Sequence, residues 1–298
     1  MIKKIGDELG GLLTAVFYRT MSMLDISTTR KIGMFITYLW YLLDQGRRNL
    51  ALKNVKQALK VDDNEAKRII RENYKHYGMM IGEIVKWKYI RERAGDYFEI
   101  EGKEILENLK GKGFILLTGH IGNWEIATIA FTTFVGEATA IVKKIQNNRI
   151  NQIVTDIRKG MGLKLITGKN TVFQMMKKLR QGEILIFLLD QNAPVREAVF
   201  VNFFGRPAST FKVVAMLAIK FEIPVVPAYC IRKEDGTFKV VIEKPFHPVK
   251  GKTLEESVRL NTQQYTDFIE KVVKLYPEQW FWVHNRWKNQ PEVKIEKK

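Results

Sequence analysis

The segment best suited to chemistry is Gly119-His120-Ile121-Gly122-Asn123-Trp124-Glu125, which follows the apolar run Phe114–Thr118. This run predicts a buried strand, and Asn123 is a good N-cap for a helix that would continue to Phe134. His120 would then lie in the crevice at the carboxyl end of a strand, where open α/β sheets bind their ligands. An imidazole in that position can accept a proton from a substrate hydroxyl.

Glu125 follows His120 by five residues. Its position in the first helical turn favours an ionised carboxylate, because the exposed N–H groups there carry partial positive charge. On one continuous helix the two side chains would lie about 140° apart, so a turn must precede the helix if they are to meet. Such a turn would bring Glu125 onto the imidazole, where its carboxylate could fix the tautomer of His120 and stabilise the imidazolium form. The alternative is a capping histidine followed by a first-turn glutamate, with no catalytic role.

Other catalytic signatures are missing from the sequence. The histidines at 76, 120, 247 and 284 show no paired spacing for a metal ion, and His284 is expected to pack among the neighbouring tryptophans. No Gly-x-Ser-x-Gly motif of serine hydrolases is present. The single cysteine, Cys230, lies in an apolar β-type run and is interpreted as a core residue. We therefore expect neither a metal nor a cofactor.

The pattern of the chain changes near Asp96. Residues 1–95 contain no proline and have helical periodicity, whereas short apolar β-type runs alternate with helical segments beyond them. This alternation predicts an α/β domain at 96–290, after a helical region at 1–95 and before a frayed tail at 291–298. The expected strands are Gly113–Thr118, Thr139–Val142, Ile184–Leu189, Pro224–Cys230 and Phe238–Ile242; helices should start near Asn123, Asn148, Thr171 and Ser209, and a last one should span Leu254–Leu275.

The chain is strongly basic. Its 298 residues include 49 Lys and Arg against 32 Asp and Glu, a formal net charge of +17. Residues 1–95 hold 18 basic and 10 acidic residues, a net +8, and are about twice as basic per residue as the rest. Such an excess indicates polyanionic surroundings, such as nucleic acid, an anionic membrane surface, or an acidic protein or lipid.

The N-terminal region also has the composition of a helix at a membrane surface. Leu9, Leu12, Leu13, Val16 and Phe17 form one helical stripe, and the aromatic-rich run Gly33–Leu43 is followed by Arg47, Arg48, Lys53 and Lys56. The longest stretches without a charge are 12 residues, Ile32–Leu43 and Gly113–Trp124, too short to span a bilayer alone. We expect interfacial binding; packing against the protein core and a tilted span are the alternatives.

Several segments together resemble a known family. The segment around His120 is similar to the His-x4-acid motif of the glycerolipid acyltransferases, and more narrowly to that of the late lipid A biosynthesis acyltransferases of Gram-negative bacteria, the lauroyl- and myristoyl-transferase type. Further segments match in the same order: Arg47–Leu50 with Asn54-Val55, Gly182-Glu183 with Leu189–Asn192, Phe203–Pro207, and Pro277–Lys288. The resemblance covers residues 30–288 and implies a sheet flanked by helices with an N-terminal membrane-associating region.

The resemblance implies transfer of a fatty acyl group from acyl carrier protein to a hydroxyl of an anionic lipid A precursor. The reaction would take place at the cytoplasmic face of the bacterial inner membrane, with His120 as the general base and Glu125 orienting it. Where the family usually has arginine after a strand, this chain has Lys143-Lys144, which keeps the charge but loses bidentate geometry. The residues expected to bind substrate are Asn123, Lys143, Arg158, Asp190 and Arg206.

Two other functions stay open. Acyltransferases for another glycolipid, of the phosphatidylinositol mannoside type, share the motif. A non-enzymatic polyanion-binding protein would also suit the charge, but no nucleic-acid-binding module is present and the basic density is highest beside apolar helices, so we expect no nucleic-acid partner.

Overall fold

A computed structural model of the chain describes residues 2–109, 111–168 and 170–291. Of the tail predicted to fray, 291–298, all but Pro291 therefore lies outside the described residues. The helices are α1 (Ile2–Ser22), α2 (Ile26–Leu43), α3 (Gln45–Leu59), α4 (Asp63–Val85), α5 (Trp87–Glu92), α6 (Ala94–Tyr97), α7 (Lys103–Glu107), α8 (Trp124–Phe134), α9 (Asn148–Gly160), α10 (Thr171–Arg180), α11 (Val213–Phe221) and α12 (Leu254–Leu275). The strands are β1 (Phe98–Glu101), β2 (Phe114–Thr118), β3 (Ala138–Ile141), β4 (Leu163–Ile166), β5 (Ile184–Leu188), β6 (Ala198–Phe203), β7 (Arg206–Phe211), β8 (Val225–Arg232) and β9 (Phe238–Ile242).

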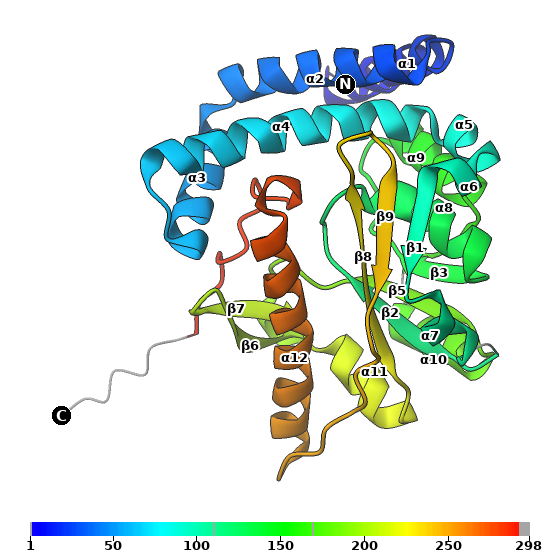
Figure 1. Cartoon of the computed structure of the whole chain (residues 1–298), viewed down its shortest axis with the longest axis vertical. Helices are drawn as coiled ribbons and strands as arrows, with labels where there is room; N and C mark the ends of the chain where they lie inside the picture. Colours follow the sequence, from blue (N-terminus) through cyan, green and yellow to red (C-terminus); the bar gives the residue numbers. More distant parts are fainter. Residues whose placement is uncertain (1, 110, 169, 292–298) are drawn as a thin grey trace.

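A mixed, mainly parallel sheet forms the centre of the fold (Figure 1), and its strand order is β1-β9-β8-β2-β5-β3-β4. The pairs β2–β5, β2–β8, β3–β5 and β3–β4 are parallel, and β8–β9 is an antiparallel hairpin. Strands β6 and β7 form a separate antiparallel pair. The sheet class predicted from the alternating pattern is confirmed.

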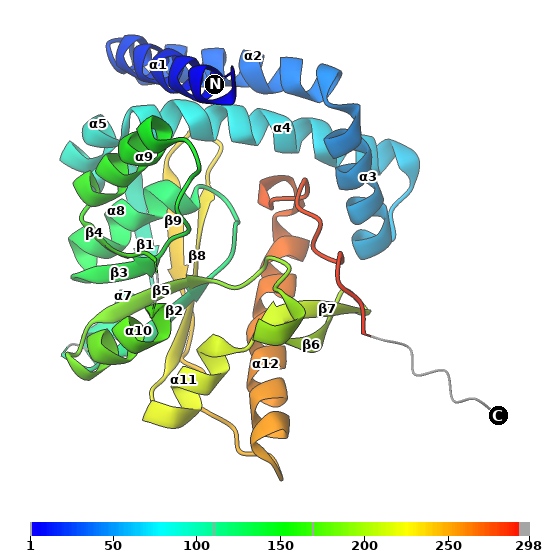
Figure 2. The ribbon, with the colours of Figure 1, turned by 180° about the vertical axis from the view of Figure 1, so that it is seen from behind.

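Both faces of the sheet are covered, which explains the continuous apolar runs of its strands. All five residues of β2 are buried. Ile115 and Leu117 belong to the core shared with α10, α11 and α12, whereas Phe114 and Leu116 belong to the core shared with α8 and α9. In Figure 2, α8 and α9 lie on one side of β3 and β4, and α10 lies on the other. The central strands are thereby held rigidly from both sides.

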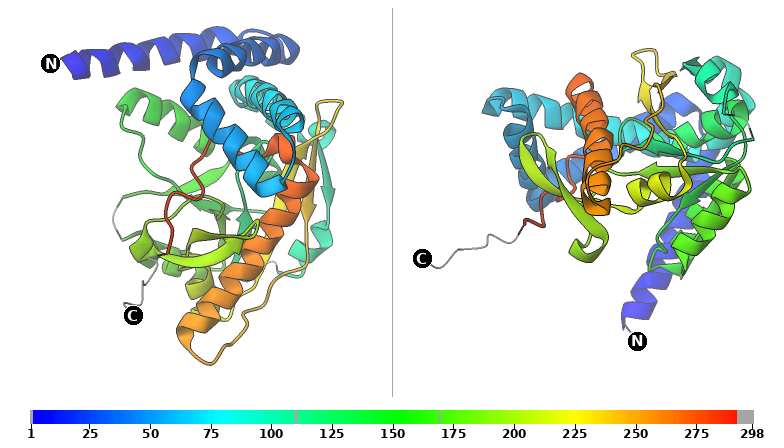
Figure 3. Two further views of the ribbon diagram at one scale, coloured as in Figure 1. Left: turned by 90° about the vertical axis from the view of Figure 1, so that its left-hand side faces the viewer. Right: turned by 90° about the horizontal axis from the view of Figure 1, so that it is seen from below.

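The N-terminal helices form a layer on the sheet domain. Helix α4 crosses the end of the domain, and α1 and α2 lie on its outer side (Figures 1 and 3). Asp25 caps α2 through the Thr28 N–H, and Asp62 caps α4 through the Glu65 N–H. The helical character predicted for residues 1–95 is confirmed.

The five predicted strands and the last helix are confirmed, but one helix start was wrong. Ser209 lies in β7, and α11 begins four residues later, at Val213. Ser209 is fully buried, and its hydroxyl donates to the Ala193 carbonyl, so it belongs to the β6–β7 pair. Strands β1, β4, β6 and β7 were not predicted, because they are short or carry polar residues that weaken the period-two signal.

The outer faces of α1 and α2 are apolar. On α1 the exposed side chains include Leu9, Leu12, Leu13 and Val16, and on α2 they include Phe35, Tyr38, Leu39 and Leu42. The opposite faces pack inward, through Gly11 of α1 and through Thr29, Gly33 and Thr37 of α2. None of the described helices is both long and apolar enough to cross a bilayer.

Candidate active site

The register of two central strands brings His120 and Asp190 together. Thr118 pairs with Leu188 in the parallel β2–β5 ladder, and each strand is followed two residues later by one of these side chains. The ladder continues past the strand ends, because the Leu189 N–H donates to the Thr118 carbonyl at 3.0 Å. His120 and Asp190 therefore meet at the carboxyl edge of the sheet, as the sequence predicted for His120.

The Asp190 carboxylate is buried, and both of its oxygens accept hydrogen bonds. Its Oδ1 accepts the Nδ1–H of the His120 ring at 2.7 Å, and its Oδ2 accepts the His120 backbone N–H at 2.8 Å and the Trp280 indole N–H at 2.7 Å. Burial alone would raise the pKa of Asp190, but the charge and hydrogen bonds of His120 and the Trp280 indole hold it at about 2. Asp190 is therefore ionised at neutral pH and fixes the His120 ring in the tautomer in which Nε2 carries the lone pair that can accept a proton.

The Nε2 side of the His120 ring has one polar neighbour and two aromatic ones. Its Nε2 lies 3.2 Å from the amide nitrogen of Gln191, which donates to it. The rings of Trp124 and Phe281 lie 5.0 and 6.0 Å from the imidazole, centroid to centroid. The His120 side chain keeps 18% of its surface exposed. A hydroxyl could reach Nε2 if the Gln191 amide moves aside, while the aromatic rings limit access of water.

Two glycines allow the turn that carries His120. Gly122 has φ +60°, and a Cβ there would lie 1.8 Å from the Cys230 carbonyl oxygen. A Cβ on Gly119 would lie 3.3 Å from the Asp190 carboxyl carbon. Neither position tolerates a side chain without displacing the turn or the carboxylate, so these glycines fix the approach of His120 to Asp190.

A buried polar network holds the same turn from behind. Asn123 caps α8 through the Ile126 N–H and donates its amide to Glu83 of α4 at 2.8 Å. His76 contacts the Gly122 carbonyl through Nε2 at 3.1 Å, and burial and the nearby Arg232 charge lower its pKa well below the usual value. His76 is therefore neutral and donates to the turn, while its Nδ1 accepts from Arg232. The turn is braced by side chains from α4 and β8.

Glu125 does not contact His120, which corrects the predicted pairing. Helix α8 begins at Trp124, and both carboxylate oxygens of Glu125 accept from the Arg158 guanidinium on α9, through Nε at 2.9 Å and through Nη2. This ion pair raises the pKa of Arg158 against the effect of its burial. Asp190 takes the position expected for Glu125, because the neighbouring strand delivers its carboxylate directly to Nδ1.

The remaining predicted substrate-binding residues occupy different places. Asn123 is fully buried and supports the turn instead of facing a substrate. Lys143 is exposed just beyond β3, whose neighbour is β5, so it lies along the same edge of the sheet as His120. Arg206 lies over the Trp287 ring and donates to Gln57 of α3. The structure does not bring Lys143 or Arg206 into contact with His120.

Sequence reasoning missed the supporting residues. Trp280 lies within a segment that matched the family, but nothing marked its indole as a donor to the site. Its segment pairs with the turn: the Phe281 N–H donates to the His120 carbonyl at 3.1 Å, and Gly122 donates to Gln279 at 2.8 Å. His284, expected to pack, accepts the Asn192 N–H at 3.0 Å, and burial lowers its pKa to about 4.

The prediction that Cys230 is a core residue can be compared directly with the structure. Cys230 is buried, as predicted. Within residues 2–109, 111–168 and 170–291, no three acidic, histidine or cysteine side chains are grouped so that they could hold a metal ion.

Comparison with known proteins indicates the chemistry of this site. The model of the family described as bacterial lipid A biosynthesis acyltransferase matches residues 7–289. The chain is 24% identical over 268 residues to a lipid A biosynthesis lauroyltransferase of Escherichia coli, covering 85% of this chain and 86% of the relative. It is 21% identical over 251 residues to a lipid A biosynthesis palmitoleoyltransferase of Escherichia coli, covering 82% and 80%. It is also 24% identical over 250 residues to a phosphatidylinositol mannoside acyltransferase of Mycolicibacterium smegmatis, covering 82% and 79%.

Proposed function

This chain belongs to the bacterial lipid A biosynthesis acyltransferase family and is a transferase that acylates a lipid, and from that premise we propose that it moves a fatty acyl group from acyl carrier protein to a hydroxyl of a lipid A precursor. The observation that carries the proposal is the hydrogen bond of 2.7 Å between the buried Asp190 carboxylate and the Nδ1 of the partly exposed His120 side chain, which leaves Nε2 as the proton acceptor. This is the arrangement that general-base catalysis on a hydroxyl requires.

The reaction follows from this geometry. His120 Nε2 takes the proton of the acceptor hydroxyl as the oxygen attacks the thioester carbonyl and forms the new C–O bond. The C–S bond then breaks, and the imidazolium returns the proton to the departing thiolate. Asp190 is a positioning residue, since it holds the ring and stabilises the imidazolium without touching the substrate.

The proposed location is the cytoplasmic face of the bacterial inner membrane. The exposed apolar faces of α1 and α2 support it, because they point away from the domain and lie beside the basic residues Arg19 and Lys31. Burying such faces among lipid headgroups, with cations attracted to anionic lipids, would hold the site next to its acceptor.

The membrane proposal predicts that two glutamates introduced on the apolar faces of α1 and α2 strongly weaken vesicle binding. Leu13→Glu combined with Phe35→Glu should weaken binding to vesicles containing phosphatidylglycerol by about 10²-fold or more, because two apolar side chains no longer enter the interface. Leu254→Glu, on the 64% exposed first residue of α12, is the control and should bind normally. Sedimentation with vesicles measures the binding. Wild-type protein that stays in the supernatant would contradict the proposal.

The acceptor is tested by mass spectrometry of lipids from Gram-negative cells lacking their own late acyltransferase. Expression of this chain should add the mass of one fatty acyl group to lipid A, and expression of the His120→Ala variant should not. Unchanged lipid A in both would exclude this acceptor.

A glycolipid of the phosphatidylinositol mannoside type is the second candidate acceptor. The similarity to the Mycolicibacterium smegmatis relative supports it, since its 24% identity equals that of the lauroyltransferase and its coverage of this chain, 82%, is close to 85%. Acyl transfer to such a mannoside but not to a lipid A precursor, measured with the purified protein, would favour it.

A further inference from the structure

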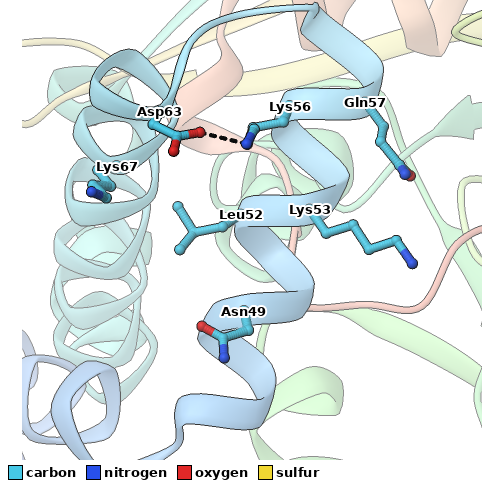
Figure 4. Close-up of a pocket in the computed structure, with 7 residues that line it drawn as sticks. All are labelled: Asn49, Leu52, Lys53, Lys56, Gln57, Asp63 and Lys67. Carbon is cyan, nitrogen blue, oxygen red and sulfur yellow. Dashed lines mark ion pairs between the residues drawn. The ribbon is translucent and has the colours of Figure 1, made fainter.

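A pocket of about 360 Å³ lies on the surface between α3 and α4 and is lined by three lysines. Figure 4 shows Lys56 of α3 paired with Asp63 on the side that faces α4, with Lys67 on α4, while the Lys53 side chain extends to the side of α3 away from α4. Among the three lysines of the described pocket, Lys56 forms an ion pair with Asp63, and the charge of Lys67 also lowers the pKa of that carboxyl. Arg206 reaches the rim, where it donates to Gln57. Positive charge is therefore concentrated here and is only partly neutralised.

The fold keeps these cations on the outside. The inner face of α3 is buried through Ala51, Asn54, Val55 and Ala58, so Lys53 and Lys56 stand on its exposed face. Like charges three and four residues apart on a helix repel one another and weaken it. An acidic partner would relieve that repulsion, and its own charge would steer it to the pocket.

The pocket is close to the site but lies away from the apolar outer faces of α1 and α2. The Asn54 amide donates to the carbonyls of Trp282 and His284, in the loop that places Phe281 against His120. Along α4, Lys67 precedes Tyr77 by ten residues, about 15 Å, and the Tyr77 ring contacts Phe281. Helix α3 runs away from the α1–α2 layer (Figure 1), so a partner bound here would stand in water beside the site.

We propose that this α3–α4 pocket, with Arg206 at its rim, is the docking surface for the acyl donor, a small acidic protein of the acyl carrier type. The inference rests on the proposed function, which supplies a carrier-bound thioester. Acidic side chains of the carrier would contact the lysines of the pocket, and the long flexible arm that bears the thioester would extend along α4 toward Nε2 of His120. The pocket selects the carrier, whereas the reacting atoms contact only the site.

The test compares the double variant K53E/K67E with a charge-matched control, K244E/K252E. The control lysines are exposed and lie between β9 and α12, at the far end of the domain from α4 (Figure 1). Binding of fluorescently labelled acyl carrier protein is measured by anisotropy, and transfer is measured with acyl carrier protein and with acyl pantetheine, which has the thioester but no protein.

The double variant should bind acyl carrier protein about tenfold more weakly or worse, and its KM for the acylated carrier should rise by the same factor. Its kcat, its use of acyl pantetheine and all properties of the control should stay unchanged. In the wild type, binding should weaken as salt is added.

Three results would overturn the inference: equal binding by the two double variants, an equal loss with acyl pantetheine, or a loss of vesicle binding with carrier binding intact. The last would assign the pocket to lipid headgroups. If labelled carrier binds as expected but no lipid is acylated from either donor, the proposed function fails while the docking surface stands.

Discussion

His120→Ala is expected to lower the turnover of acyl transfer by about 10²–10⁴-fold, because the substitution removes Nε2, the atom that would accept the proton of the acceptor hydroxyl. Asp190→Asn should lower the turnover by a comparable factor. The amide keeps the shape of the carboxylate but removes the charge that stabilises the imidazolium and can present an N–H to Nδ1, which would favour the wrong tautomer.

The double variant His120→Ala/Asp190→Asn should be little slower than either single variant, since Asp190 acts only through the ring. Steady-state rates with saturating donor measure this, and thermal unfolding confirms that each variant is folded. Additive losses would mean that Asp190 has an independent role. Near-normal turnover of His120→Ala would remove the general-base mechanism.

The Glu125→Gln variant tests whether Glu125 or Asp190 is the carboxylate that orients His120. The amide oxygen of the introduced glutamine can still accept one hydrogen bond from Arg158, so the loss of turnover should be clearly smaller than that of Asp190→Asn. A larger loss from Glu125→Gln would restore the pairing predicted from the sequence, and would require α8 to start in another orientation in the working enzyme.

The difference between these acids shows where sequence reasoning succeeds. The strand before His120, the glycines beside it and the Asn123 cap are local features, and all are readable from neighbouring residues. The pairing of β2 with β5 is not local: 70 residues separate His120 from Asp190, and many other strand orders fit the same apolar runs. Asp190 was recognised as a site residue through the family resemblance, but its contact with Nδ1 required the register.

The sequence also did not reveal which charged residues are buried. Glu83 and Arg232 look like ordinary surface residues in a sequence that is 27% charged, and neither occurs in a motif. Their burial becomes intelligible only once α2, α4 and β8 are seen to meet behind the His120 turn. The exposed apolar faces of α1 and α2 were predictable as stripes, but which side the domain would cover was not.

Glu83→Gln is expected to destabilise the protein by about 3–5 kcal/mol, because it leaves buried guanidinium groups without a counter-charge. The Glu83 side chain is completely buried and accepts from Arg30 at 2.9 Å, from Arg232 at 2.7 Å and from Asn123 at 2.8 Å. The amide of glutamine replaces one acceptor by a donor that would face an arginine. At about 2–4 °C per kcal/mol, the Tm should fall by roughly 6–20 °C.

The matched control is Glu65→Gln, which removes the same charge from the exposed pair with Arg68 and should lower the Tm far less, because water solvates both groups. Scanning calorimetry measures both. Adding Arg232→Gln to Glu83→Gln should cost less than the sum of the single changes, since one uncompensated charge is then gone. Equal Tm values for Glu83→Gln and Glu65→Gln would contradict the network. Removing the charge of a carboxylate buried between two arginines should destabilise the protein more than removing that of a solvated one.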